Sequence, residues 1–430
     1  MRRGSRKLIE ASTIVFVLIY MLTILLAATE MTTLSVSALI GALLSLWFGL
    51  NYNLFTYNEA LAFVDIKLLA LILGVSIVVE VAERSGLFHV LALYAIKLTG
   101  GSPHRLFFSM CFTAAAVSLF LSDTTAILLI AAATGTIARI MKYNPKPYFV
   151  SAAIMINLGG SSTLIGSVGN MIIGFSSGLS FTDFIQYLTP CEVLLWLLTS
   201  LALYLYYRDQ LGEKKEPPTY NPWEVVKDRG LLYKSTIILI LFILLLLQYD
   251  KWNIGPEAVA LGCAVLALAV SGVDPAEVFR RVDWETIFFI AGFFFIVGSI
   301  ERTGILAAAS KGIFDLARGD LLTAMVLTLW SSGVVSTVVS NIAVALTFVP
   351  IIQGLQIIDK TPIWSALVLG TNLGGAATPL SGAVCVMAIG ALKREGIKLS
   401  FHEFTKIGFI TTFIQLIVST LYLIIRFGLW

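Results

Sequence analysis

The chain has 430 residues, of which 58% are hydrophobic and only 13% charged, and its formal net charge is +3. A soluble domain of this size could not bury so much apolar surface, so the composition excludes a water-soluble globular protein. The Lys and Arg residues form no basic stripe, which excludes a nucleic-acid-binding protein. Apolar runs long enough to cross a lipid bilayer recur along the sequence, and they predict an all-α polytopic membrane protein.

Taken in chain order, the apolar runs predict five membrane-spanning helices in each half of the chain. The ranges expected to span are 11–29, 33–50, 65–82, 147–177 and 184–206, and then 235–250, 256–271, 284–301, 362–392 and 405–427. Each half also has a segment too short to span, 86–98 and 304–317, which we expect to lie along the membrane interface. Each half further has a pair of apolar runs with a polar interruption in the middle, 105–141 and 320–358.

Four short motifs occur twice in the same order, which predicts that the chain is a duplicated unit. The pairs are Val64-Asp65 with Val282-Asp283, Glu83–Gly86 with Glu301–Gly304, Leu121–Asp123 with Val339–Asn341, and Asn157–Thr163 with Asn372–Thr378. The first three pairs share an offset of 218 residues, and the fourth has an offset of 215. We therefore expect repeat 1 in residues 1–207, a polar linker in 208–234 and repeat 2 in 235–430. An odd number of crossings in each repeat predicts that the two repeats are inverted relative to each other.

Asp123 follows Ser122 in the polar interruption of the first paired run. The apolar run on each side would form a helix about 24 Å long, slightly shorter than the ~30 Å hydrocarbon core. One interpretation is a tight polar turn between two spanning helices, with Asp123 solvated at the surface. The other is a re-entrant hairpin whose tip stops inside the protein, where a carboxylate would cost about 3 kcal/mol or more unless it binds an ion. The second half repeats Ser and then a carboxamide, Ser340-Asn341, which favours the re-entrant hairpin.

Residues Asn157–Asn170 interrupt an apolar run with four glycines and six small polar residues. Each glycine weakens a helix interior by about 1 kcal/mol, so we expect a broken helix here. Backbone groups freed by the break must line a cavity or bind a ligand, and carbonyl, Ser, Thr and Asn oxygens suit a hard cation such as sodium. The second copy, Asn372–Gly382, adds a further break at Pro379. The alternative is close helix packing through small residues, but the polar content exceeds what packing requires.

These motifs define the predicted substrate-binding and ion-binding residues. They are Ser122, Asp123, Thr124, Asn157, Gly160, Thr163, Asn170, Ser340, Asn341, Asn372, Gly375 and Thr378. We expect a coupling ion, sodium or a proton, near Ser122, Asp123 and Asn157, and the substrate between the two hairpin tips and the two broken helices. We expect no cofactor, because no His, Cys and carboxylate residues have metal-binding spacing and no glycine-rich segment has the Lys of a phosphate-binding loop.

Other polar residues in the apolar runs are given structural roles. Glu80, Glu192 and Glu301 lie near the ends of the expected helices, and we interpret them as interfacial. The four cysteines are expected to be small buried hydrophobic residues. Asp123 has no carboxylate or His partner at the matching position of the second repeat, so an intramembrane enzyme is the least favoured class.

Together the motifs resemble the ion transporter superfamily, in its citrate-transporter-like group. That group includes the divalent anion/sodium symporters, the arsenite permeases and the sodium/proton antiporters related to the melanosomal P protein. The symporters carry Ser-Asn-Thr at each hairpin tip, where this chain has Ser122-Asp123-Thr124 and Ser340-Asn341-Ile342. Their broken helices carry a Gly-Gly…Thr-Pro…Gly pattern, similar to Gly159–Asn170 and Gly374–Gly382 here.

The resemblance covers nearly the whole chain and implies a scaffold that forms a homodimer and a transport domain that moves as a rigid body. It implies a secondary active transporter in the plasma membrane, in which a sodium or proton gradient drives a small anion by alternating access. That anion would be a dicarboxylate, a citrate-like anion or arsenite. A sodium/proton antiporter is the alternative, and a channel is a more distant one.

The chain departs from the symporter pattern at the first hairpin tip. Asp123 stands where the symporters have Asn, Ile342 replaces a Thr, and Gly169 replaces the proline before Asn170. A fixed negative charge would repel a dicarboxylate by about 4 kcal/mol at about 4 Å and an effective dielectric of about 20. We therefore interpret Asp123 as a coupling-ion or proton site.

Overall fold

In a computed structural model the described part of the chain folds into helices and their connections. The structure describes residues 2–28, 32–121, 123–214, 221–379, 383–394 and 399–429. All the regular secondary structure of these residues is helical, which confirms the all-α fold predicted from hydropathy.

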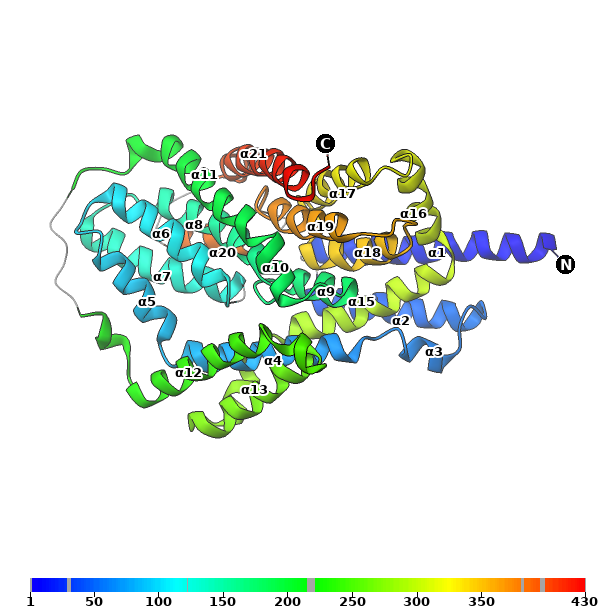
Figure 1. Cartoon of the computed structure of the whole chain (residues 1–430), viewed down its shortest axis with the longest axis horizontal. Helices are drawn as coiled ribbons and strands as arrows, with labels where there is room; N and C mark the ends of the chain where they lie inside the picture. The colour runs from blue at the N-terminus through cyan, green and yellow to red at the C-terminus, as the bar shows by residue number, and fades with distance from the viewer. Residues whose placement is uncertain are drawn as a thin grey trace.

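The helices of the two halves follow each other in the same series (Figure 1). The first half contains α1 (Arg2–Ala28), α2 (Leu34–Asn51), α3 (Tyr57–Leu61), α4 (Ile66–Arg84), α5 (Leu87–Lys97), α6 (Pro103–Ser118), α7 (Asp123–Met141), α8 (Lys146–Gly159), the 3-10 turn η1 (Gly160–Ser162), α9 (Val168–Ser177), α10 (Phe181–Tyr187) and α11 (Thr189–Tyr207). The second half contains α12 (Arg229–Leu246), α13 (Pro256–Ser271), α14 (Pro275–Arg281), α15 (Trp284–Arg302), α16 (Ile305–Leu316), α17 (Leu321–Ser336), α18 (Asn341–Gln353), α19 (Thr361–Gly374), α20 (Ala383–Arg394) and α21 (Phe401–Phe427). The expected paired runs are the helix pairs α6–α7 and α17–α18, and both expected broken helices are interrupted at their glycines.

Six helices of the described residues are long and apolar enough to cross a membrane. They are Leu34–Asn51, Tyr57–Arg84, Thr189–Gln210, Arg229–Leu246, Trp284–Arg302 and Phe401–Phe427. The other expected spans are shorter: α13 has 16 residues, the first span contributes the apolar stretch Ser12–Ala27, and each broken helix is divided in two. The fold is therefore that of a multi-pass membrane protein.

The motifs that occur twice mark corresponding helix boundaries. Asp65 and Asp283 are the N-caps of α4 and α15, and each carboxylate accepts a hydrogen bond from the backbone N–H three residues further on. Such caps satisfy an otherwise unpaired N–H at the start of a helix. At the other ends of these helices, Gly86 and Gly304 adopt φ values of 81° and 79° and lead into α5 and α16. Glycine is favoured there because a side chain is strained in the left-handed region.

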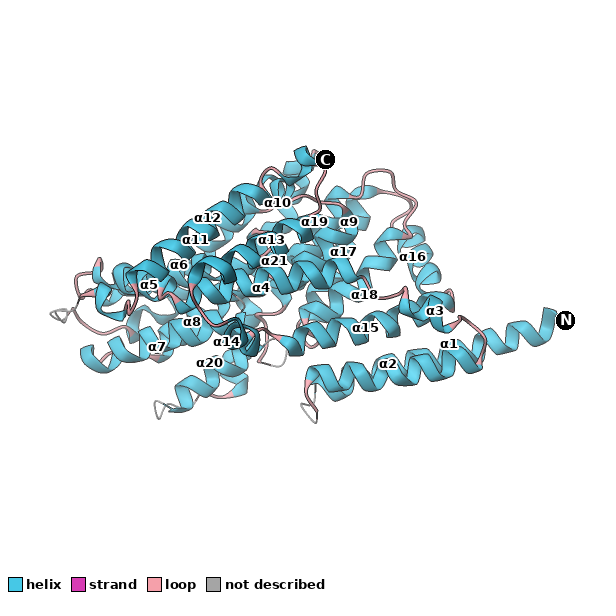
Figure 2. Ribbon diagram, turned by 90° about the horizontal axis from the view of Figure 1, so that it is seen from below, coloured by secondary structure: helices cyan, strands magenta, loops and turns pink. Residues whose placement is uncertain are grey.

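Helices of the two halves pack against each other in exchanged pairs. Helix α4 packs against α13 of the second half, and α15 packs against α2 of the first. Figure 1 shows α4, α12 and α13 side by side along the lower edge. Figure 2 shows α1 beside α2 at the end of the molecule where the N-terminus lies. Among the broken helices, α9 packs against α18 and α20 packs against α7. Each half thus completes the surroundings of the other, while the repeat boundaries and the inverted orientation stay predictions.

Candidate functional site

The first segment of each broken helix is attached to the hairpin of its own half by a serine. In the first half the Ser118 hydroxyl of α6 donates to the carbonyl of Ile156 in α8 at 2.7 Å. In the second half the Ser336 hydroxyl of α17 donates to the carbonyl of Thr371 in α19 at 2.6 Å. All four residues are buried. The bonds fix the last turn of each segment just before the chain leaves the helix.

A threonine beyond each break reaches the tip of the same hairpin. The Thr163 hydroxyl donates to the Leu119 carbonyl at 3.3 Å, and the Thr378 hydroxyl donates to the Thr337 carbonyl at 2.6 Å. Both hairpin-tip carbonyls lie at a helix C-terminus, where no backbone N–H of the same helix can satisfy them. The two threonines therefore join each break to a hairpin tip.

Backbone contact at the glycines makes this attachment close. A Cβ atom at Gly159 would lie 2.2 Å from the carbonyl oxygen of Ala115 in α6. A Cβ atom at Gly374 would lie 2.2 Å from the carbonyl oxygen of Gly333 in α17. Only glycine fits at this distance, so these glycines set the approach of each broken helix to its hairpin.

Asn170, in the first turn of α9, closes the first break. Its amide nitrogen donates to the carbonyls of Gly160 at 2.9 Å and Thr163 at 2.7 Å. Its amide oxygen accepts a hydrogen bond of 2.8 Å from Asn372, which belongs to α19 of the second half. Asn170 and Asn372 are both buried. The two broken helices are therefore joined directly by a pair of asparagine side chains.

Two further contacts bring polar groups of the two halves together. The amide nitrogen of Asn341, at the start of α18, donates to the Ser167 hydroxyl at 3.4 Å. The amide nitrogen of Asn157 lies 3.8 Å from the sulfur of Cys385 in α20. A Cβ atom at Gly375 would lie 3.4 Å from the amide oxygen of Asn157. Cys385 is buried as expected, but its place beside Asn157 was not predicted.

The structure brings most of the predicted site residues to one place. The buried ones are Asn157, Gly160, Thr163, Asn170, Asn372, Gly375 and Thr378, and the half-buried ones are Ser340 and Asn341. Ser340 is the N-cap of α18. Ser122 and the side chains of Asp123 and Thr124 lie outside the described residues, so a sodium site beside them stays a prediction.

The chemistry of this place is polar and uncharged in the part that the structure describes. Its groups are backbone carbonyls, asparagine amides and Ser or Thr hydroxyls, which are hard oxygen ligands and hydrogen-bond donors. Within the described ranges no group of three or more His, Cys, Asp or Glu residues could hold a metal ion. Neutral oxygens of this kind are chemically suited to a small ion.

The prediction that Glu192 lies at an interface is wrong. Its side chain is fully buried in α11, because α8 and α21 both pack against this helix. One carboxyl oxygen of Glu192 is hydrogen-bonded to Ser161 of η1, within the first break. The expected helix 184–206 already placed Glu192 away from the helix end, and that register was the signal that the interpretation overlooked. Glu80 is also buried, whereas Glu301 is exposed as expected.

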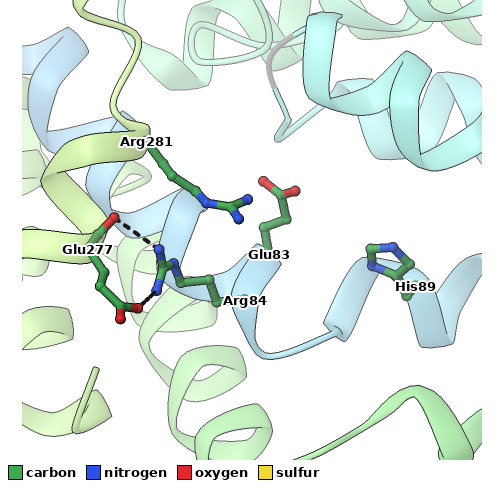
Figure 3. Close-up of a pocket in the computed structure, with 5 residues that line it drawn as sticks. All are labelled: Glu83, Arg84, His89, Glu277 and Arg281. Atoms are coloured by element: carbon green, nitrogen blue, oxygen red, sulfur yellow. Dashed lines mark hydrogen bonds and ion pairs between the residues drawn. The ribbon is translucent and has the colours of Figure 1, made fainter. Parts of the chain in front are cut away.

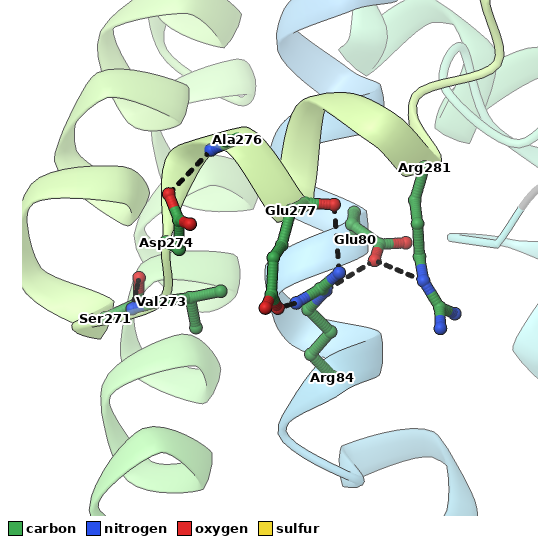
Figure 4. Close-up of polar contacts among 8 residues, drawn as sticks. All are labelled: Glu80, Arg84, Ser271, Val273, Asp274, Ala276, Glu277 and Arg281. Atoms are coloured by element: carbon green, nitrogen blue, oxygen red, sulfur yellow. Dashed lines mark hydrogen bonds and ion pairs between the residues drawn. The ribbon is translucent and has the colours of Figure 1, made fainter.

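A charged cluster joins α4 of the first half to α14 of the second. Arg84 donates through Nε to Glu80 at 2.7 Å and through Nη1 to Glu277 at 2.6 Å, and Arg281 Nε lies 3.8 Å from Glu80 (Figure 4). A pocket of 320 Å³ beside it is lined by Glu83, Arg84, His89, Glu277 and Arg281 (Figure 3). Because each cation of the cluster has a carboxylate partner, we interpret it as a clamp between the halves.

The comparison with protein families identifies the class. The citrate transporter family matches residues 24–370, and the chain belongs to this family. An uncharacterized transporter of Mycobacterium tuberculosis is 30% identical over 376 residues, which cover 85% of this chain and 87% of that protein. A 46 kDa membrane protein of Mycobacterium leprae is 27% identical over 425 residues, covering 96% and 99%.

A solved structure has the same fold. The YdaH transporter of Alcanivorax borkumensis superposes with a TM-score of 0.64 at 16% identity, and the match covers 89% of each chain. The P protein of Sus scrofa is 23% identical over 457 residues, which cover 86% of this chain and 54% of the pig protein. The chain is therefore a multi-pass membrane transporter of the citrate transporter family, and not an enzyme.

Proposed function

We propose that the protein is a secondary active transporter of the plasma membrane that moves a small anion, coupled to a sodium or proton gradient. The anion is a dicarboxylate, a citrate-like anion or arsenite. The substrate binds between the two hairpin tips and the two broken helices, and the transport domain alternates between the two sides of the membrane. Membership of the citrate transporter family supports the anion.

The single observation that carries this proposal is the contact between the two broken helices. Asn372 donates to Asn170 at 2.8 Å, although 202 residues separate them in the chain. The buried polar segments of the two halves therefore meet, which supports one site rather than two. In lipid, polar backbone and side chains are tolerated where they line a cavity or bind a ligand, which is what a transporter site requires.

In this proposal Asp123 is the coupling-ion site at the first hairpin tip. Its sequence position, next to Ser122 and Thr124, corresponds to Ser340-Asn341 at the second tip. The second tip contacts the first broken helix through Asn341 and Ser167. By the same relation the first tip is expected to meet the second broken helix, and the packing of α7, which begins at Asp123, against α20 supports this expectation. A cation or proton at Asp123 would cancel the repulsion of an anionic substrate.

The test is transport by purified protein in proteoliposomes. Sodium and proton gradients are imposed separately, and succinate, citrate and arsenite are offered in turn to wild type and Asp123→Asn. We expect one gradient to drive uptake by the wild type, and the Asn variant to lose or change its ion dependence. Identical ion dependence in the two proteins would contradict the role of Asp123, and no uptake of any of the three anions would contradict the anion proposal.

A sodium/proton antiporter is the second candidate, because the first hairpin tip carries an acidic residue and no Lys or Arg occurs in the site segments. It predicts sodium-dependent proton movement in liposomes that contain none of the three anions. A channel predicts a flux that does not saturate with substrate concentration. The same proteoliposomes therefore separate all three classes.

We also propose that the protein works as a homodimer, which the resemblance to the divalent anion symporters supports. Native mass spectrometry of the detergent-purified protein tests it. A monomer mass over the full range of protein concentrations would contradict the proposal.

A further inference from the structure

Glu192 is a buried carboxyl group that the transport site described above does not use. It has no exposed surface, and its Oε2 atom has no hydrogen-bond partner among the described residues. Its Oε1 atom is hydrogen-bonded to Ser161 Oγ in the first break. Trp196, one turn further along α11, is its other polar neighbour. An ionised carboxylate is poorly solvated in such surroundings.

Most charged groups on the helices around α11 have other partners. Lys146 of α8 pairs with Glu403 of α21, Asp183 of α10 caps its own helix, Arg426 of α21 lies over the Tyr187 ring, and His104 of α6 meets Tyr204. The others, Arg105 of α6 and His402 and Lys406 of α21, are exposed. Within the described ranges no Lys, Arg or His forms an ion pair with Glu192. A negative charge on Glu192 would therefore have no cation to balance it in this part of the chain.

Ser161 Oγ lies between two groups that can accept its hydrogen. It donates to the carbonyl of Leu158 at 2.6 Å, at the last turn of α8, and it is hydrogen-bonded to Glu192 Oε1. A serine hydroxyl has one hydrogen, and a backbone carbonyl can only accept. A proton on Glu192 would satisfy both contacts at once, because Glu192 would then donate to Ser161 Oγ while Ser161 donates to Leu158. The geometry therefore accommodates a protonated carboxyl group.

The second half fills the corresponding place without an ionisable group. Ser180 and Ser400 cap corresponding helices in the two halves, and they are 220 residues apart in the sequence. With the same offset, the residue of the second half that corresponds to Glu192 is Thr412. The Thr412 hydroxyl donates directly to the carbonyl of Leu373 in the last turn of α19 at 3.1 Å. A neutral threonine therefore suffices to satisfy this helix end, so a carboxyl group is not required for packing.

We propose that Glu192 is a proton-binding residue of the transport cycle and that Ser161 transmits its protonation state to the first broken helix. With the proton on Glu192, the Ser161 hydroxyl satisfies the Leu158 carbonyl. When the carboxyl group releases its proton to water, the Ser161 hydroxyl turns to the carboxylate, and the Leu158 carbonyl is freed at the break. A freed carbonyl is a ligand for a cation in the neighbouring site. This inference rests on the proposed coupled transport.

The first test is an infrared titration of detergent-purified protein. Wild type should show the C=O stretch of a protonated carboxyl group that disappears in Glu192→Gln, a variant of the same shape that cannot ionise. Thr412→Val is the matched control, because it removes the corresponding hydrogen bond of the second half and should leave the band in place. A spectrum in which Glu192→Gln removes no carboxyl band at any pH would overturn the proposal, whether or not the protein transports anions.

The second test measures proton movement with citrate movement, using an entrapped pH dye and labelled citrate in proteoliposomes. Glu192→Gln should lose proton-driven citrate accumulation and lower the number of protons moved per citrate. Ser161→Ala should keep the carboxyl band but lose the link between citrate and proton flux. If Glu192→Gln removes the band yet moves as many protons per citrate as wild type, Glu192 is only a buried structural acid. Wild type that moves no anion would instead count against the proposed function, and the infrared result would still decide the state of Glu192.

Discussion

The two broken helices are attached to their hairpins in the same way but are supported from behind by different side chains. In each half a serine and a threonine bond corresponding backbone carbonyls of the break and the hairpin. Behind the first break lie Ser161 and Glu192, and behind the second lie Ala376 and Thr412. The duplicated part is thus the backbone framework, whereas the group that can exchange a proton occurs on one side only.

Comparing the two halves separates the features that the fold requires from those that the transport cycle requires. A contact that both halves make with equivalent atoms is sufficiently explained by the geometry of a broken helix in lipid. A polar group present in one half alone requires another explanation, because the other half folds without it. Three variant pairs test this comparison by changing corresponding residues in the two halves.

The largest effect is expected at the glycines that face the hairpins. Gly159→Ala and Gly374→Ala should each lower the free energy of unfolding by about 3 kcal/mol, because the new Cβ meets a backbone oxygen that cannot move aside. Gly262→Ala, where a Cβ would meet nothing within 4 Å, is the control and should be neutral or stabilised by up to about 1 kcal/mol. Thermal unfolding in detergent measures all three. Destabilisation of only one of the two breaks would show that they are not attached equivalently.

A smaller and unequal effect is expected at the ion pairs between the halves. Arg84 bonds the buried Glu80 and also Glu277, whereas its counterpart Arg302 lies 3.8 Å from Glu59 with both side chains 47% exposed. Arg84→Gln should lower the free energy of unfolding by about 2 kcal/mol. This is less than for a fully buried ion pair, because Arg84 and Glu277 are partly exposed. Arg302→Gln should cost only a small fraction of that, because water solvates both partners of an exposed pair.

The control for these ion pairs is salt. High ionic strength should reduce the effect of Arg302→Gln more than that of Arg84→Gln, because exposed pairs are screened more strongly. Unfolding temperatures at low and high salt give the comparison. If Arg84→Gln and Arg302→Gln lowered the unfolding temperature equally at low and at high salt, the Arg84 cluster would not be the stronger clamp.

The smallest effect is expected at the caps of the two hairpins and depends on pH. Hydrogen bonds from the Thr323 hydroxyl and N–H hold the pKa of the Asp320 carboxyl below its usual value, whereas the corresponding cap of α6 is the neutral Ser102. Because the pKa in the folded state is below that in the unfolded state, the stabilisation is present above about pH 4 and is lost as the pH falls through the folded pKa. Asp320→Ser should therefore unfold at the same temperature as wild type at low pH and slightly lower at neutral pH. A difference that is the same at every pH, as expected for Ser102→Ala, would contradict the role of the charge.

The helices, the paired apolar runs and the two breaks could be predicted from the sequence alone. These are local properties, because an apolar run must be helical in lipid and a glycine-rich polar run must interrupt it. Asp65 and Gly86 could be matched to Asp283 and Gly304 by their common spacing alone, since the same residues cap or end the same helices. The segments of the candidate site were predicted for the same reason.

Which of these polar residues meet, and which are buried, depends on the tertiary structure. Asn372 contacts Asn170 across 202 residues and Asn341 contacts Ser167 across 174, and no local pattern specifies such pairs. The burial of Glu192 was missed because a carboxyl group in an apolar helix looks interfacial until other helices are packed over it. Burial depends on the neighbours that the fold brings to a residue, and those neighbours give a carboxyl group its solvation and its partners.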